Sequence, residues 1–102
     1  MKSYVLSEKL GGTKELTMRV AATGPSGYKV GLININATEH SFSKLKYTER
    51  STNVASVEVQ INGVTSTNPT IGTEFDVSNK SIRVIVATQV NWDEQYVIIT
   101  LS

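Results

Sequence analysis

Apolar and polar residues alternate along much of the chain, and this period of two predicts β-strands. The alternation is clearest in residues 15–22 and 56–61, where every second residue is Leu, Met, Val, Ala or Ile. A helical period would instead place Glu15, Arg19 and Glu58 among the core residues. Each segment is therefore expected to be a strand with one buried face and one face toward water.

Turn signals separate the predicted strands. Asn62-Gly63 is the strongest, because a type I′ turn needs positive φ at both central residues, so 54–61 and 64–67 are expected to form a tight hairpin. The other breaks are expected at Gly11-Gly12, Gly24-Pro25-Ser26-Gly27, Asn68-Pro69 and Ser78-Asn79-Lys80. The remaining strands then cover residues 3–10, 28–36, 75–77, 81–88 and 95–101.

Some segments depart from simple alternation. In 28–36 the apolar positions change phase at Leu32-Ile33, which predicts a β-bulge or burial on both faces. Segments 82–86 and 96–99 are almost continuously apolar, which is typical of a central strand or of a strand at a partner interface. In residues 38–50 the alternation of the second half favours a strand over a short helix, and both interpretations stay open.

Composition supports an all-β protein. The chain has 102 residues, the size of one domain, and contains 12 Val, 8 Ile and 12 Thr but only 2 Met. Eight or nine short strands with regular turn spacing predict one antiparallel β-sandwich domain over residues 1–102, immunoglobulin-like or jelly-roll-like.

The second half of the chain shares the turn and strand pattern of a known family. The matching segments are Val57 to Gly63, Phe75-Asp76-Val77, Ser78 to Val84 and Tyr96 to Leu101. With these segments, residues 57–101 resemble the second half of a bacterial cadherin-like β-sandwich repeat, within the immunoglobulin-like group. Residues 1–56 do not match. The resemblance implies an accessory or adhesive module on a cell or phage surface, with no catalytic residues to carry over.

Charge and cysteine content exclude several classes of partner and site. The formal net charge is +1, and the densest basic stretch, Lys44 to Arg50, also contains Glu49. We expect this stretch to be a solvated strand edge and not a nucleic-acid interface, which needs a clustered cationic face. The chain has no cysteine, which excludes disulfides, thiolate metal sites and a cysteine nucleophile.

Two features of the sequence bear on localisation. No apolar run reaches the roughly 18 residues of a membrane helix, so no membrane insertion is expected. The start, Met1-Lys2-Ser3-Tyr4, has no hydrophobic signal-peptide region. An extracellular or virion-associated location is favoured.

Catalytic motifs are not evident. His40 is the only histidine and no serine lies in a Gly-x-Ser-x-Gly elbow, so His40 is expected in a solvated loop. Glu74 and Asp76 share one strand face and Asp93-Glu94 lie in a turn; all four are expected to be exposed, whereas a general acid needs a raised pKa. We therefore expect no enzyme activity, no cofactor and no metal site.

Trp92 is the most informative position for binding. It is the only tryptophan and lies in the polar turn 89–95, where it either covers the core or anchors a ligand or partner. The candidate binding residues are therefore Trp92, Asn91, Asp93 and Glu94. Asn91, Asp93 and Glu94 also carry oxygen atoms of the kind that bind calcium, but three oxygen donors in a hairpin are commonplace, so no calcium site is expected.

The consecutive apolar residues of segments 82–86 and 96–99 predict a self-association face. Ile85, Val97 and Ile99 are the candidate interface residues, because a two-layer sandwich covers only one face of each sheet. The sequence thus predicts a non-enzymatic binding or assembly module whose partner is a protein or glycan surface or, in a homo-oligomer, a second copy of the chain. The alternatives are a small lectin-like carbohydrate binder using the Trp92 turn and a cytosolic inhibitor that pairs an edge strand with its target.

Overall fold

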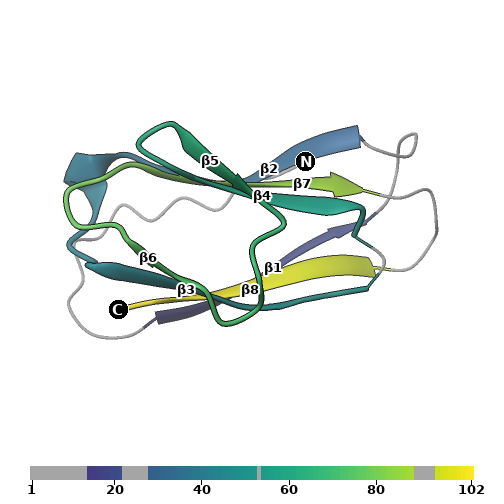
Figure 1. The fold of residues 1–102 in the computed structure, drawn as a ribbon. Helices are drawn as coiled ribbons and strands as arrows, with labels where there is room; N and C mark the ends of the chain where they lie inside the picture. Colours follow the sequence, from purple (N-terminus) through teal and green to yellow (C-terminus); the bar gives the residue numbers. More distant parts are fainter. Residues whose placement is uncertain (1–13, 22–27, 53, 89–93) are drawn as a thin grey trace.

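Two antiparallel four-stranded sheets pack face to face as a β-sandwich (Figure 1), which confirms the predicted fold class. The computed structural model describes residues 14–21, 28–52, 54–88 and 94–102. The strands are β1 (Lys14–Ala21), β2 (Tyr28–Ile35), β3 (Lys44–Arg50), β4 (Ser56–Ile61), β5 (Val64–Thr67), β6 (Glu74–Asp76), β7 (Ile82–Thr88) and β8 (Glu94–Leu101). The segment 3–10, expected as a further strand, lies outside the described residues.

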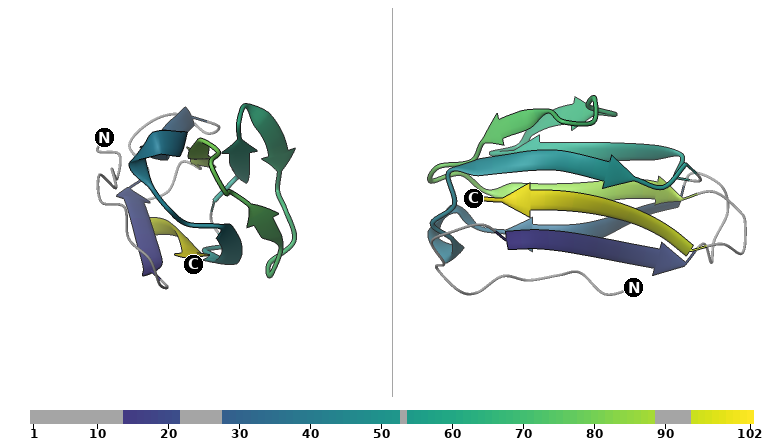
Figure 2. Two further views of the ribbon diagram at one scale, coloured as in Figure 1. Left: turned by 90° about the vertical axis from the view of Figure 1, so that its left-hand side faces the viewer. Right: turned by 90° about the horizontal axis from the view of Figure 1, so that it is seen from below.

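The strand order is that of a jelly roll, one of the two expected topologies. One sheet has the order β1-β8-β3-β6 and the other β2-β7-β4-β5. The pairs β1–β8, β2–β7, β3–β6 and β4–β5 are those of one long hairpin of eight strands rolled into two layers. Figure 2 shows the layers end-on and shows β8 between β1 and β3. Both nearly continuous apolar segments are central strands, as predicted.

The described turns have the backbone conformations that the sequence predicts. Asn62 and Gly63 have φ of 50° and 81°, and Ile61 lies opposite Val64 in the hairpin. Asn68, at the break after β5, has φ of 49°, and Asn79, between β6 and β7, has φ of 56°. The two glycine-containing breaks at 11–12 and 24–27 lie outside the described residues.

Two bulges change which side chains face the core. The β2–β7 register shifts between Gly31 and Ile33, so Leu32 and Ile33 are both buried, as their change of phase predicts.

Residues 38–50 contain the end of a 3₁₀ helix (Ala37–Glu39) followed by β3, which confirms the strand. A second register shift lies between Tyr47 and Glu49 in β3 and is not signalled by the sequence.

The core lies between the sheets and is almost entirely aliphatic. Its fully buried members include Met18, Leu32, Leu45, Tyr47, Val57, Val84, Ile99 and Leu101. Within the described ranges, no helix is long and apolar enough to cross a membrane.

Candidate functional site

The predicted binding residues fall largely in a segment that the structure does not describe. Asn91, Trp92 and Asp93 lie outside the described residues, and Glu94 is the first residue of β8, with its side chain not described. The Trp92 turn therefore stays a prediction.

The interface prediction is wrong for Val97 and Ile99. Both side chains are 0% exposed and pack between the sheets, so neither lies on the surface of the folded chain. Side chains alternate along β8, and the outer face carries Tyr96, Ile98 and Thr100 instead. Ile85 does lie on the outer face of its sheet, where it is half-buried.

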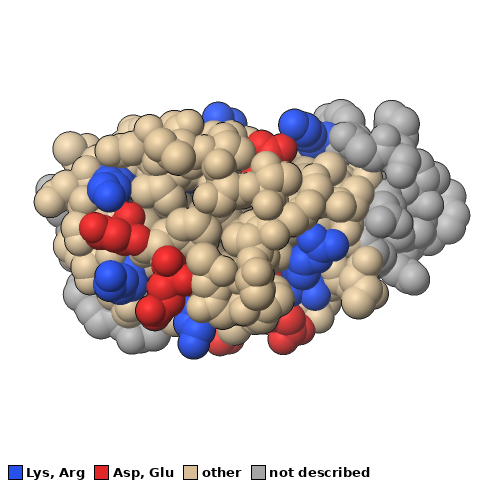
Figure 3. All heavy atoms as spheres, in the orientation of Figure 1, with Lys and Arg blue, Asp and Glu red and all other residues tan. Residues whose placement is uncertain are grey.

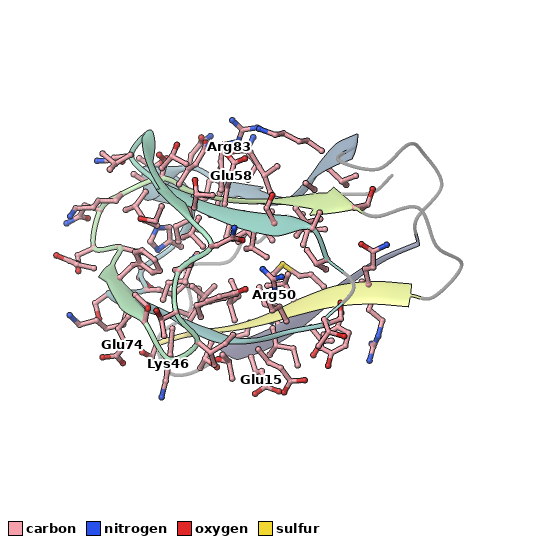
Figure 4. The ribbon with its side chains drawn as sticks, turned by 45° about the vertical axis from the view of Figure 1, so that its right-hand side comes forward. Glu15, Lys46, Arg50, Glu58, Glu74 and Arg83 are labelled. Carbon is pink, nitrogen blue, oxygen red and sulfur yellow. The ribbon has the colours of Figure 1, made fainter. Side chains whose placement is uncertain are left out.

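The outer sheet faces are polar. Ile85 lies opposite Gly31 and Glu58, and the Glu58 carboxylate forms an ion pair of 2.9 Å with Lys29. On the other sheet, Tyr96 donates a hydrogen bond to the Glu49 carboxylate, which raises the pKa of Tyr96. Figure 4 shows Glu58 and Arg83 outside one sheet and Glu15, Lys46 and Glu74 outside the other. The described sheet faces thus lack the broad apolar patch that the sequence predicts.

The prediction that His40 is solvated is wrong. His40 is 6% exposed and its ring stacks on Phe42, with centroids 5.9 Å apart. Its Nδ1 accepts the Phe42 backbone N–H at 3.1 Å, so the hydrogen lies on Nε2, which donates to the Lys80 carbonyl oxygen at 2.8 Å. The imidazole is thus engaged on both nitrogens and fixes the turn before β7.

The paired carboxylates of β6 are exposed, as expected. Glu74 lies opposite Lys46 and Asp76 opposite Lys44 in the β3–β6 ladder. A hydrogen bond from the Ser78 backbone N–H, at 3.0 Å, lowers the pKa of Asp76. This shift is opposite to the one that a general acid needs.

The expectation that Lys44 to Arg50 forms a solvated strand edge is wrong, because β3 lies between β8 and β6 and Arg50 is half-buried. The bulge at Tyr47–Glu49 turns its side chain toward the other sheet (Figure 4). Its Nη2 donates to the Val54 carbonyl oxygen at 2.9 Å and its Nη1 to Asn68 Oδ1 at 3.1 Å. We call these contacts the Arg50 bridge, because they join the end of β3 to Asn68, the residue that follows β5 in the other sheet.

Tyr47 lies beside this bridge in the core. The side chain is 0% exposed, and within the described part of the chain its hydroxyl has no hydrogen-bond partner. Burial raises the pKa of Tyr47, and the positive charge of Arg50 opposes that change. The Arg50 bridge therefore places a cation next to a buried, unsatisfied hydroxyl.

An open groove of about 410 Å³ lies where the edge strands β5 and β6 face each other across the two sheets. We call it the edge groove; its lining residues are Ile61, Asn62, Val64, Phe75, Asp76 and Lys80. Ile61 and Phe75 are partly buried against the core, whereas Val64 is 70% exposed. Lys80 Nζ lies 3.7 Å from Asp76 Oδ2 and adds an ion pair to the lining.

Hydrogen bonds hold the walls of the edge groove in place. Asn62 Oδ1 accepts the Ser81 backbone N–H at 2.8 Å, and the Asn62 N–H donates to the Ser81 carbonyl oxygen at 3.0 Å. The turn that carries Lys80 is fixed by its carbonyl bond to His40. The groove is therefore a preformed feature with an apolar floor and one ion pair.

The outer edge of β5 presents backbone groups that no other described strand pairs with. Asn68, the residue after this strand, donates its N–H to the Val57 carbonyl oxygen at 2.7 Å. Hydrogen-bonded positions alternate along an antiparallel ladder, so the N–H and C=O groups of Thr65 and Thr67 point away from β4. Among the strands that the structure describes, none follows β5 in its sheet order, so these groups lie on the edge of that sheet.

The β5 edge also lacks charge. The charged residues on the other three edge strands are Lys14, Glu15 and Arg19 on β1, Lys29 on β2, and Glu74 and Asp76 on β6. Charges, bulges and short length keep edge strands from pairing with other chains. β5, Val-Thr-Ser-Thr, has only four residues but carries neither charge nor bulge. Figure 3 shows an uncharged area over β5 with Lys, Arg, Asp and Glu around it.

The sequence analysis predicts the hairpin that carries β5 but does not identify the edge groove or the uncharged β5 edge. Its sequence signal is an uncharged four-residue strand between Asn62-Gly63 and Asn68-Pro69. Among the described residues, no group of three or more His, Cys, Asp or Glu side chains could hold a metal ion. No family model matches the chain, and searches of curated proteins and of solved structures find no match.

Proposed function

We propose that the protein is a non-enzymatic binding or assembly module that receives an extended segment of a protein partner as an added strand on β5. The observation that carries this proposal is the open, uncharged edge of β5 with the exposed Val64 beside the edge groove. In strand addition, main-chain hydrogen bonds supply affinity and pockets for alternate side chains supply specificity. Thr65 and Thr67 offer the main-chain groups and the groove offers a place for one apolar side chain.

The chemistry of the groove favours binding over catalysis. Its lining has an apolar floor, one amide and one ion pair, and the Asp76 carboxylate has a lowered pKa. Proton transfer near neutral pH would need a pKa raised toward that range. A partner side chain of Val, Ile or Leu type would cover Val64 and Phe75 and remove apolar surface from water.

A location at a cell or virion surface forms part of this proposal. Jelly rolls build viral capsid and lectin domains, and the resemblance of residues 57–101 implies a surface module. The inhibitor alternative uses the same strand addition, whereas the lectin alternative depends on Trp92, which lies outside the described residues.

A phage-displayed library of random twelve-residue peptides, selected on the immobilised full chain, tests the proposal. We expect enriched peptides with alternating apolar and hydroxyl residues, and amide shifts at Val64–Thr67 and Phe75 when a synthetic copy is added. Thr65→Pro removes an outward N–H that β4 does not use, and should weaken binding by at least about tenfold, or 1.4 kcal/mol.

Thr65→Ala is the matched control, because it loses the same hydroxyl but keeps the N–H. Circular dichroism and urea midpoints establish that both variants fold. Peptides that bind Thr65→Pro as tightly as Thr65→Ala, shifts confined to other strands, or no enrichment at all would each refute strand addition at β5.

A further inference from the structure

We infer that the strand added to β5 comes from a second copy of this chain, which pairs its own β5 antiparallel about a twofold axis at Ser66. The inference rests on the proposed function, because it needs β5 to accept a strand. A twofold pair uses the same surface on both copies, so the strand must be complementary to itself.

Charge distinguishes β5 from the edge strand β6 in this respect. A twofold pair of β6 strands about Phe75 would place Glu74 opposite Asp76 of the second copy, and like charges directly opposite destabilise a sheet. β5 carries only Val, Thr and Ser, so its self-pairing brings no like charges together. Its neutral, β-branched sequence also has a high strand propensity.

The backbone geometry selects the register. The outward N–H and C=O groups belong to Thr65 and Thr67, so both form hydrogen-bonded pairs only when the axis passes at Ser66. Thr65 of each copy then lies opposite Thr67 of the other, and each pair exchanges two N–H···O bonds. In a register shifted by one residue, Thr65 would lie opposite Ser66 of the second copy. The backbone N–H and C=O of Ser66 already bond to β4, so they could not pair with Thr65.

The flanking residues limit and support the pairing. Val64, 70% exposed, would lie opposite Asn68 of the second copy and lose part of its exposed surface. Asn68 has a left-handed φ of 49° and precedes Pro69, which has no N–H, so the paired segment is short. The Arg50 bridge holds Asn68 and thereby the end of the strand. The result is one continuous eight-stranded sheet, β2-β7-β4-β5 of each copy.

Sedimentation equilibrium of the full chain from micromolar to millimolar concentration tests this assembly. We expect the average mass to rise from 11.1 kDa toward twice that value. In the double variant Thr65→Lys/Thr67→Lys, lysines of the two copies face each other, and the dissociation constant should rise at least about tenfold. In Thr65→Glu/Thr67→Lys, opposite charges face each other, and it should stay within about threefold of the original chain.

The two variants share Thr67→Lys and differ only in the sign of the charge at position 65. Both positions are exposed, and urea midpoints check that both variants fold. The control Thr38→Lys/Ser78→Lys adds the same net charge at exposed positions on other segments and should leave the dimer intact. Amide exchange of Thr65 and Thr67 should slow as concentration rises.

The remaining outcomes each refute self-pairing through β5, and one of them refutes strand addition as well. A mass of 11.1 kDa at all concentrations refutes the second copy as partner, and peptide binding at β5 would then still support strand addition. A dimer that both charge variants leave unchanged shows that association uses another surface. A monomer that also fails to bind library peptides refutes both proposals.

Discussion

Substitutions of Asn68 test how much the hydrogen bonds at the end of β5 stabilise the fold. Its N–H donates to Val57 O, and its Oδ1 accepts the Val57 N–H at 2.9 Å and Arg50 Nη1 at 3.1 Å. Its φ of 49° lies in the left-handed region, which Asn adopts more readily than Ala. Asn68→Ala therefore removes two acceptor contacts and adds backbone strain.

The expected loss of stability follows from these three contributions. The bond to the partly buried Val57 N–H is worth about 1 kcal/mol, and the exposed bond to Arg50 about 0.5 kcal/mol after solvent screening. The left-handed backbone costs Ala about 1 kcal/mol more than Asn. Asn68→Ala should thus lower the free energy of unfolding by about 2–3 kcal/mol. Asn68→Asp keeps the acceptor and should stay within about 0.5 kcal/mol.

Urea unfolding followed by circular dichroism measures these differences. Asn79 is the matched control, because it has a similar φ of 56° and no side-chain hydrogen bond in the described part of the structure. Asn79→Ala should cost only the backbone contribution, about 1 kcal/mol. Asn68→Gly relieves the strain and should cost about 1.5 kcal/mol.

Equal losses for Asn68→Ala and Asn79→Ala would refute the reasoning, because the side-chain bonds would then contribute nothing. A loss in Asn68→Asp as large as in Asn68→Ala would show that the amide nitrogen, and not Oδ1, makes the important contact.

Two further substitutions test local features. Gly63→Val should cost about 2–4 kcal/mol in urea unfolding, because a β-branched residue is disfavoured at φ of 81°, although an added Cβ would meet no atom within 4 Å. Gly31→Ala is its control: an added Cβ is equally free of contacts and φ is not positive, so coinciding midpoints for the two variants would contradict the turn assignment. Tyr47→Phe removes a buried hydroxyl that has no hydrogen-bond partner among the described residues, and it should leave the free energy of unfolding unchanged or raise it by up to about 1 kcal/mol. A decrease of more than about 1 kcal/mol would show that the hydroxyl is satisfied in solution.

Local sequence determines the strands and turns of this protein. Asn62-Gly63 specifies its hairpin because positive φ at two adjacent residues is a property of those residues themselves. The bulge in β2 is also predictable, because Leu32 and Ile33 are adjacent apolar residues and both need burial. These features depend only on neighbours in the chain.

The tertiary structure alone decides which strands meet and which face of each strand is covered. Alternation gives a strand two faces, but in the continuously apolar β8 it does not say that Val97 and Ile99 face the other sheet. Because of the bulge in β3, the Arg50 side chain points toward the other sheet. The buried His40 ring is held by a hydrogen bond to the carbonyl oxygen of Lys80, which is distant in the sequence. Whether β5 is an edge depends on how the eight described strands pair, because a strand is an edge only where no further strand of the sheet adjoins it.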